Sequence, residues 1–357
     1  MTVLIFLIVL AILIFVHELG HFLFARACDI RVDAFALGFG PKIVSWQKGE
    51  TVYTINLIPF GGYVKIFGEN PDEESIGGPD SARSFVNKSR PKQALVLFAG
   101  VLFNFIFAWL LYTVVFTNGV TATAGDFTRY KDYLSNQRIM ITSVMPGSPA
   151  DKIGLKIGDV FYDVKNIEDI QNAINSSNGS NIDIKYIRNN EVKNVAITPI
   201  QGIVNNKYAI GIGMDNVADM RLPFFVSVWE SLRYTWVMIK GTISGLYGFL
   251  IGILHGTAKL SEVSGPIGIA GIIGDAANLG FTYLVMMIAI ISINLGVINL
   301  VPFPALDGGR ILFVFIESII RRRIPVRFAN IVNTVGFALL MALMVLVTYK
   351  DIAKLIH

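Results

Sequence analysis

The chain has only one cysteine, Cys28, among its 357 residues. A single thiol excludes an internal disulfide, so cysteine usage gives no evidence of an oxidising compartment. Charge is also scarce, because charged residues make up 16% of the chain and the formal net charge is +4. No long block of lysine and arginine occurs, and the sequence therefore predicts no nucleic-acid partner.

Hydrophobic residues, in contrast, make up 53% of the chain, which is not the composition of an ordinary soluble domain. A helix needs about 20 apolar residues to cross the hydrocarbon core of a bilayer, which is roughly 30 Å thick. Four stretches meet that length and are predicted to be transmembrane helices: 1–24, 93–117, 283–303 and 328–348. We therefore expect a mainly α-helical, multi-pass integral membrane protein in contact with membrane lipid.

A fifth apolar stretch, 226–254, is interrupted by Glu230, Arg233 and Lys240 and by several glycines. Charged side chains at mid-bilayer are expensive, so we expect this stretch to lie along the membrane surface. The first apolar stretch resembles a secretory signal. It lacks a basic start and leads into HELGH rather than into a small-residue cleavage site, so we expect it to stay attached.

The segment between the first two predicted helices contains β-branched and aromatic runs separated by glycine, proline and polar residues. Such runs are typical of short strands, and we expect β-hairpins associated with the membrane. Basic residues lie near the membrane ends of this segment, as at Arg26 and Arg90, and again at 321–323. The positive-inside rule places this face in the cytoplasm.

From about residue 121 to residue 220 the hydropathy falls, and the pattern favours a separate, soluble α+β domain. Its run GSPADKIGLKIGDVF, residues 147–161, resembles a PDZ domain. PDZ domains bind extended peptides by adding a strand to a sheet edge, so a peptide ligand is one expectation. The alternative is that this domain only caps the membrane part or limits access to it.

The motif HELGH places His17 and His21 four residues apart, so both imidazoles project from one face of a helix and can meet one metal ion. Zinc fits this pattern, because it lowers the pKa of a bound water toward about 7 and Glu18 can take the proton. An incidental pattern is the alternative. It leaves Glu18 unexplained, since a charge at the centre of a membrane helix costs about 2.5–3.5 kcal/mol.

Catalytic zinc usually has three protein ligands, and Asp307 in NLVPFPALDGG is the other carboxylate expected at membrane depth. Pro302 and Pro304 prevent a regular helix there. Irregular backbone at that depth must be satisfied inside protein or beside water. Asp307 is also a reasonable N-cap for a helix that begins near Gly308, and the two roles are compatible.

Four membrane crossings bring these two motifs together. The first helix would enter from outside and end near the cytoplasm, and the third would run the same way and deliver Asp307 to the same depth. The domain at 121–220 then lies outside the cytoplasm and the basic turn RRRIPVR lies inside it, as the positive-inside rule requires. A full crossing by 226–254 would move Asp307 to the opposite face.

These motifs resemble those of the site-2 protease family of intramembrane zinc metalloproteases, and within it the bacterial RseP type. The similar stretches are HELGHFLFAR (17–26), ALGFGPKI (36–43), IPFGGYVKIFGE (58–69), FVNKS (85–89), SGPIGIA (264–270) and INLGVINLVPFPALDGG (293–309). The HExxH motif alone occurs in many proteases, whereas its combination with NLxPxPxLDGG and an intervening PDZ-like domain is specific.

The resemblance implies that His17, His21 and Asp307 bind zinc and that Glu18 activates water. It also implies that residues 31–67 dip into the membrane and that an edge strand there holds an unwound substrate segment. The residues that the resemblance assigns to the substrate are Gly62, Tyr63, Val64, Lys65, Ile66, Asn294 and Asn299. A hydrogen bond between helices is the alternative role for Asn294.

The sequence departs from the family in two places. The familiar RseP proteins carry two PDZ domains in tandem, whereas residues 121–220 leave room for one. The family often has AGPxxNF in its second helix, whereas this chain has AGVLFNF, in which Asn104 is kept and Val101 replaces the proline.

We therefore predict an N-terminal half of a membrane protease domain (1–120), an inserted PDZ-like domain (121–220), membrane-surface helices (221–282) and the C-terminal half of the protease domain (283–357). The predicted activity is intramembrane zinc endopeptidase. By resemblance its substrates are single-pass membrane proteins, such as anti-sigma factors or remnant signal peptides, in a bacterial inner membrane. The rival functions are a non-enzymatic membrane scaffold that recruits peptides through the PDZ-like domain, and a metal transporter with buried His and Asp ligands.

Overall fold

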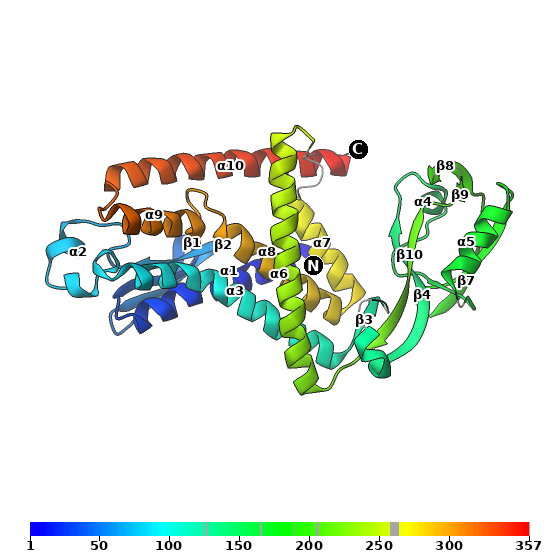
Figure 1. The fold of residues 1–357 in the computed structure, drawn as a ribbon, viewed down its shortest axis with the longest axis horizontal. Coiled ribbons are helices and arrows are strands. Elements are labelled where there is room, and N and C mark those ends of the chain that lie inside the picture. Colours follow the sequence, from blue (N-terminus) through cyan, green and yellow to red (C-terminus); the bar gives the residue numbers. More distant parts are fainter. Residues whose placement is uncertain are drawn as a thin grey trace. The chain divides into compact units, whose positions relative to one another are not determined.

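The computed structural model describes residues 1–123, 125, 128–164, 166–188, 190–204, 207–257 and 264–356. The chain divides into two compact units, each drawn in Figure 1. The first unit combines Met1–Val115 with Phe224–His357, and the second is Phe116–Pro223. The second unit is thus inserted in the sequence of the first.

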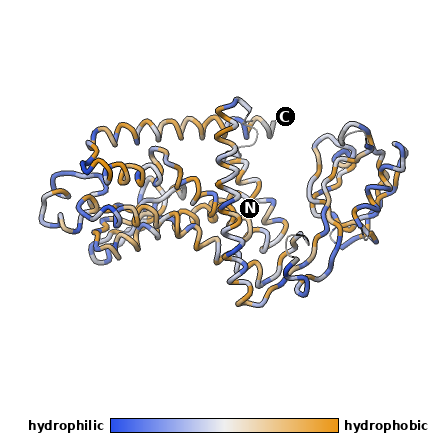
Figure 2. Tube along the Cα trace, viewed as in Figure 1, coloured by the Kyte–Doolittle hydropathy of each residue, from blue (hydrophilic) through white to orange (hydrophobic). Residues whose placement is uncertain are grey.

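The first unit is mainly helical. Its long helices are α1 (Thr2–Ala27), α3 (Arg90–Asn118), α6 (Phe224–Leu254), α8 (Phe281–Leu300) and α10 (Val326–Ile356), its shorter helices are α2 (Glu73–Gly77), α7 (Pro266–Leu279) and α9 (Asp307–Ile320), and it has 3-10 turns at Ser81–Arg83 and Phe85–Asn87. Within the described ranges, 5 helices are long and apolar enough to cross a membrane. Figure 2 shows hydrophobic residues predominating along α10. The mainly helical architecture with several apolar spans agrees with the sequence-based expectation.

Helix α6 is where the structure differs from the expected count of four crossings, because it also is long and apolar enough to span. One face of α6 packs against its neighbours, with Glu230 only 5% exposed. Trp109 of α3 donates to the Val228 carbonyl of α6 over 2.9 Å. Protein thus shields the carboxylate that set this stretch apart in the sequence and removes part of its penalty. Length and composition do not confirm the count of four.

Helix α1 buries one face against the rest of the first unit. Phe6, Val9, Leu13 and His17 recur along it at intervals of three or four residues, which keeps side chains on one side of a helix. Gly20 allows a close approach to α3, since a Cβ atom there would lie 2.3 Å from the carbonyl oxygen of Ala99. The apolar periodicity therefore turns the histidines of HELGH toward protein.

Strands β1 (Val32–Lys48) and β2 (Thr51–Ile66) form an antiparallel sheet that folds back on itself. Residues 34–37 of β1 pair with 52–55 on one side and with 62–65 on the other. The fold-back needs Gly38, whose φ is +76° and whose Cβ would lie 2.4 Å from the carbonyl oxygen of Ile58. Among the strand pairings described, residues 62–66 pair on one side only, so they form an edge.

This sheet is fixed to the helices by a shared apolar core. Phe22 of α1, Phe35 of β1 and Leu97 of α3 belong to one buried cluster together with Val64 of the edge segment. Each of these side chains is less than one-tenth exposed. The edge segment is therefore held at a fixed place beside α1.

The second unit is an α+β fold. Its strands are β3 (Val120–Thr123), β4 (Leu134–Val144), β5 (Val160–Phe161), β6 (Ile182–Arg188), β7 (Glu191–Ile197), β8 (Ile200–Val204), β9 (Lys207–Ala209) and β10 (Ile212–Met220), and its helices are α4 (Pro149–Lys152) and α5 (Ile167–Ser176), with a 3-10 turn at Thr128–Tyr133. Six strands form one sheet in the order β3-β10-β4-β5-β6-β7, and β8 pairs with β9. Helix α5 covers the sheet with Ile170 and Ile174, which pack against Ile141 and Phe161 in the core of this unit.

Candidate metal centre

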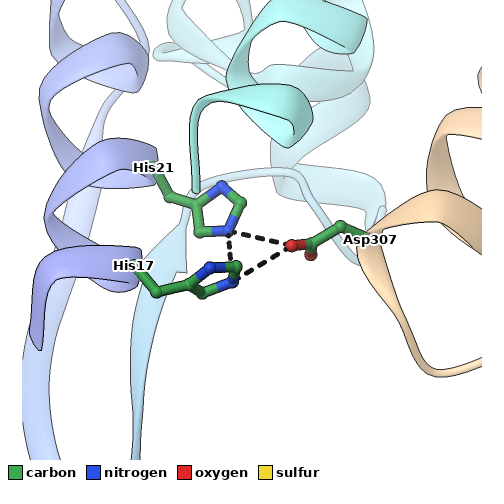
Figure 3. A group of neighbouring side chains, drawn as sticks. All are labelled: His17, His21 and Asp307. Carbon is green, nitrogen blue, oxygen red and sulfur yellow. Dashed lines mark hydrogen bonds and ion pairs between the residues drawn. The ribbon is translucent and has the colours of Figure 1, made fainter. Parts of the chain in front are cut away.

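The two histidines of HELGH lie one turn apart on the buried face of α1. His17 and His21 are 9% and 8% exposed, and their Nε2 atoms are 3.3 Å apart. Figure 3 shows both imidazoles directed at the carboxylate of Asp307. The helical repeat of 3.6 residues produces this pairing directly from the HExxH spacing.

Asp307 reaches the histidines from the start of α9. The residues before it are not helical, as expected for a segment containing Pro302 and Pro304, and Ala305 has a left-handed φ of +71°. Leu306 is the N-cap of α9 and Asp307 is the first helical residue. The side chain of Asp307 is therefore free of the capping role that the sequence allowed, and it faces the imidazoles.

The two glycines of LDGG explain how α9 can begin so close to the end of α8. A Cβ atom on Gly308 would lie 2.3 Å from the carbonyl oxygen of Leu300, and one on Gly309 would lie 2.3 Å from that of Phe303. Any larger residue would push the first turn of α9 away from this backbone. The glycines thereby set the position of Asp307.

Three potential ligand atoms converge at this point. Asp307 Oδ2 lies 3.1 Å from His17 Nε2 and 3.3 Å from His21 Nε2, and the ligand atoms of the three residues all lie within 4.8 Å of one another. Oδ2 is buried, yet no described residue makes a hydrogen bond to it. A buried carboxylate oxygen without a donor is costly, so this arrangement fits a metal cation that accepts electron pairs from all three residues.

His21 is held in the tautomer that metal binding requires. Its Nδ1 atom donates to the carbonyl oxygen of Val96 in α3 over 2.9 Å. A carbonyl oxygen only accepts, so Nδ1 carries the proton and Nε2 keeps its lone pair. Metal-binding histidines commonly use the second ring nitrogen in this way.

A cavity of about 430 Å³ lies beside the three ligand residues. It is lined by His17, Glu18, His21, Gly62, Tyr63, Val64, Lys65, Ile66, Glu69, Asn70, Ala305, Asp307 and Arg310. The structure thus brings the expected base, the three expected ligands and the five expected edge-strand residues to one cavity. Gly62 lies very close to the base, because a Cβ atom on it would be 3.5 Å from Cγ of Glu18.

The two asparagines expected near the substrate lie outside the lining of this cavity. Asn294 of α8 accepts a hydrogen bond from Thr242 of α6 over 3.1 Å, which is the helix-to-helix contact that the sequence left open. Asn299 is half-buried near the end of α8.

Other residues around the site have no role in the sequence-based prediction. Glu69 and Arg310 line the cavity and form an ion pair with each other. On α3, Gly100 and Asn104 face the imidazoles. The spacing of four between Gly100 and Asn104 is the signal that could have placed both on one helix face.

Comparison with known proteins gives consistent matches over almost the whole chain. The profile of peptidase family M50 matches residues 5–343. A Clostridium perfringens protein provisionally named a zinc metalloprotease is 35% identical over 352 residues, which is 97% of each chain. A Campylobacter jejuni protein with a similar provisional name is 32% identical over 364 residues, 98% of this chain and 92% of its own. Zinc metalloprotease RasP of Shouchella clausii is 28% identical over 435 residues, 99% of each chain.

Proposed function

The chain belongs to peptidase family M50, and from this premise we propose that it is an integral-membrane zinc endopeptidase that cuts single-pass membrane proteins within or near their spanning segments. The convergence of His17, His21 and Asp307 on one point carries the proposal. The names of the relatives support zinc as the metal and proteolysis as the activity.

The residues that line the cavity have two proposed roles, metal binding and proton transfer. His17, His21 and Asp307 hold the metal. Zinc in such a ligand set acts as a Lewis acid and activates water as a nucleophile at neutral pH. Glu18 lines the same cavity, where it takes the proton from the attacking water and returns it to the leaving amine.

The edge segment Gly62–Ile66 presents the substrate. A transmembrane helix satisfies its amides internally, so it must be extended locally before a peptide carbonyl can be attacked. The side of 62–66 that β1 does not pair with offers replacement hydrogen bonds to an extended segment. Asn299 is proposed to hold the exposed substrate backbone, whereas Asn294 contributes to the packing of α6 against α8.

The proposal extends to the second unit as a PDZ-like peptide binder outside the cytoplasm of a bacterial inner membrane. A cavity of about 190 Å³ lies between α5 and the start of β10, lined by residues that include Gln171, Ile174 and Ile212. Among the strand pairings that the structure describes, β10 pairs with β4 from Ile212 onward and with β3 from Val217 onward. A peptide is proposed to bind at this cavity, which α5, β9 and the start of β10 line, by adding a strand to the sheet.

The substitution Glu18→Gln tests the proposed base in the full chain, reconstituted in lipid nanodiscs with a single-pass substrate. A general base contributes about 10²- to 10⁴-fold to rate, so we expect a loss of cleavage of that order with zinc retained. Glu230→Gln is the matched control, because it neutralises another buried carboxylate on an apolar helix and should keep activity. Full activity in Glu18→Gln would refute the assigned base.

Metal content separates the enzyme from a non-enzymatic scaffold, and cleavage of a substrate separates it from a metal transporter. A peptide-recruiting scaffold would hold no stoichiometric zinc and would be indifferent to Asp307→Ala, whereas the peptidase should lose both zinc and cleavage. The natural substrates, proposed as anti-sigma factors or remnant signal peptides, are tested by mass spectrometry of membrane peptides from cells that carry either the wild-type or the Glu18→Gln enzyme.

A further inference from the structure

Helix α3 presents three groups to the imidazoles, at intervals of four residues along one face. The carbonyl of Val96 accepts from Nδ1 of His21 over 2.9 Å. Gly100 leaves room for the rings, because a Cβ atom there would lie 2.4 Å from Nε2 of His21. The amide of Asn104 lies 3.1 Å from Nδ1 of His17. Both Nε2 atoms face Asp307, and both Nδ1 atoms face α3.

The two histidines need the same tautomer to bind one metal through Nε2. Each must carry its proton on Nδ1, so each needs an acceptor on the side of α3. Val96 supplies one for His21 through its backbone. For His17, the polar side chain at that position is Asn104.

An asparagine amide can turn either its oxygen or its nitrogen toward a neighbour, with almost the same shape. When the nitrogen faces His17, the amide oxygen is fully buried and has no hydrogen-bond partner among the residues described. When the oxygen faces His17, it accepts from Nδ1 and leaves the lone pair of Nε2 for the metal. The second orientation therefore gives Nδ1 of His17 the acceptor that the metal-binding tautomer requires.

We propose that Asn104 is a positioning residue for zinc, which accepts a hydrogen bond from Nδ1 of His17 and so fixes the tautomer and the ring orientation of that ligand. The inference rests on the proposed zinc site. It adds a side chain of α3 to a centre whose ligands come from α1 and α9.

Asn104 is well placed for this role because its own backbone is held. The hydroxyl of Ser292 in α8 donates to the carbonyl oxygen of Asn104 over 2.8 Å, and Ser292 is fully buried. One turn of α3 is thereby tied to α8 beside the metal ligands. A support on a rigid helix gives a more exact ligand geometry than one on a loop.

The test measures zinc affinity of the full chain in nanodiscs by competition with a chelator. Asn104→Leu keeps the size of the side chain and removes the acceptor, and we expect zinc binding about 10- to 100-fold weaker. Asn104→Asp keeps an acceptor oxygen and should bind within a few-fold of wild type. Thr113→Val is the matched control, since it removes a buried hydroxyl from the same helix that bonds to Ser231 of α6, and its affinity should not change.

The outcomes separate this inference from the proposed function. Wild-type affinity in Asn104→Leu, or an equal loss in the Leu and Asp variants, would overturn the role of Asn104 while the zinc site stands. Absence of zinc from the wild-type chain would instead overturn the proposed function.

A measurement on the wild-type chain keeps the inference testable if Asn104→Leu does not fold. Nitrogen-15 NMR of labelled histidines in the zinc-loaded protein should show His17 with its proton on Nδ1. A proton on Nε2 in the loaded protein would contradict the proposal.

Discussion

At the scale of single residues, Gly100 determines how closely α3 can approach the metal-binding imidazoles. A methyl group there would lie 2.4 Å from Nε2 of His21 and 2.8 Å from Cε1 of His17, both well inside van der Waals contact. Alanine would favour the helix itself by up to about 1 kcal/mol. We therefore expect Gly100→Ala to lose zinc and cleavage without a loss of helical structure.

Gly241 provides the control for this prediction, because a Cβ atom there would meet nothing within 4 Å. Gly241→Ala should keep both zinc and cleavage, as measured by metal analysis and substrate turnover in nanodiscs. Normal zinc content in Gly100→Ala would show that the rings can move aside.

The metal ligands were predictable from the sequence, but the residues of α3 that contact the two histidines were not. The HExxH spacing fixes His17 and His21 on one helix face, and the LDGG motif marks Asp307. Val96 acts through its backbone carbonyl, which every residue type possesses and no motif records. The role of Asn104 depends on how α3 packs against α1, which is a tertiary property.

At the scale of elements, the edge segment of β2 lies directly against the proposed base. A Cβ atom on Gly62 would be 2.9 Å from the carbonyl oxygen of Ala36 in β1, 3.0 Å from Cγ2 of Ile14 and 3.5 Å from Cγ of Glu18. A β-branched residue would press on α1 at the level of Glu18 and displace the edge. We expect Gly62→Val to reduce cleavage at least tenfold, the cost of about 1.4 kcal/mol in the transition state, while zinc stays bound.

Gly62→Val should lose cleavage and keep zinc, whereas Gly100→Ala should lose both. Gly77→Ala serves as its control, because a Cβ atom there meets nothing within 4 Å. Equal cleavage in Gly62→Val and wild type would show that the edge does not present the substrate.

In the second unit, Asp219 joins three strands. It accepts hydrogen bonds from Thr121 of β3 (2.9 Å), Asn136 of β4 (3.1 Å) and Arg138 of β4 (2.8 and 3.0 Å). The hydrogen bonds from Arg138 hold the pKa of Asp219 below its ordinary value. Because the folded-state pKa is lowered, this stabilisation is present above the unfolded pKa of about 3.9 and is lost as the pH falls.

We expect Asp219→Asn to lower the stability of this unit at neutral pH by no more than about 1 kcal/mol, since the carboxylate is 40% exposed and water screens it. Hydrogen exchange of β3 and β10, compared between variant and wild type at each pH, should show faster exchange in the variant at pH 7. The difference should begin to shrink as the pH falls below about 4 and should vanish only below the lowered folded-state pKa of Asp219. A difference that grows on acidification would contradict this account.

For the sheet of the first unit, the sequence predicted the strands but not the way in which they pair. Its β-branched runs predicted strands in the segment before α2, and strands are present. The double pairing of 34–37 depends on backbone bends at Gly38 and Gly40, with φ of +76° and +86°. A glycine permits such a bend without requiring it, so register could not be read from the sequence.

At the scale of the whole molecule, the metal centre constrains how the chain crosses the membrane. His17 and His21 lie in the C-terminal half of α1, and Asp307 follows the C-terminal end of α8, so we predict that α1 and α8 cross in the same direction. After α3 returns, only an even number of further crossings can precede α8. A crossing by α6 alone would break this rule, even though α6 is long enough.

Cysteine labelling tests this topology. In a Cys28→Ala background, Ser176→Cys in the second unit and Arg322→Cys after α9 should react with an impermeant thiol reagent from opposite sides of the membrane. Reaction of both from the same side would show that α6 crosses alone and would contradict the shared depth of the ligands.

The way the second unit begins and ends has a consequence for how such proteins diversify. Its first strand and its last strand are neighbours, with Val120 opposite Met220 and Thr123 opposite Val217. The inserted sequence thus leaves the helical part and returns to it through a two-stranded stem. A longer, shorter or duplicated insert can be exchanged at this stem without changing the separation between the end of α3 and the start of α6, so the inserted unit can vary in evolution while the helices that carry the metal ligands stay the same.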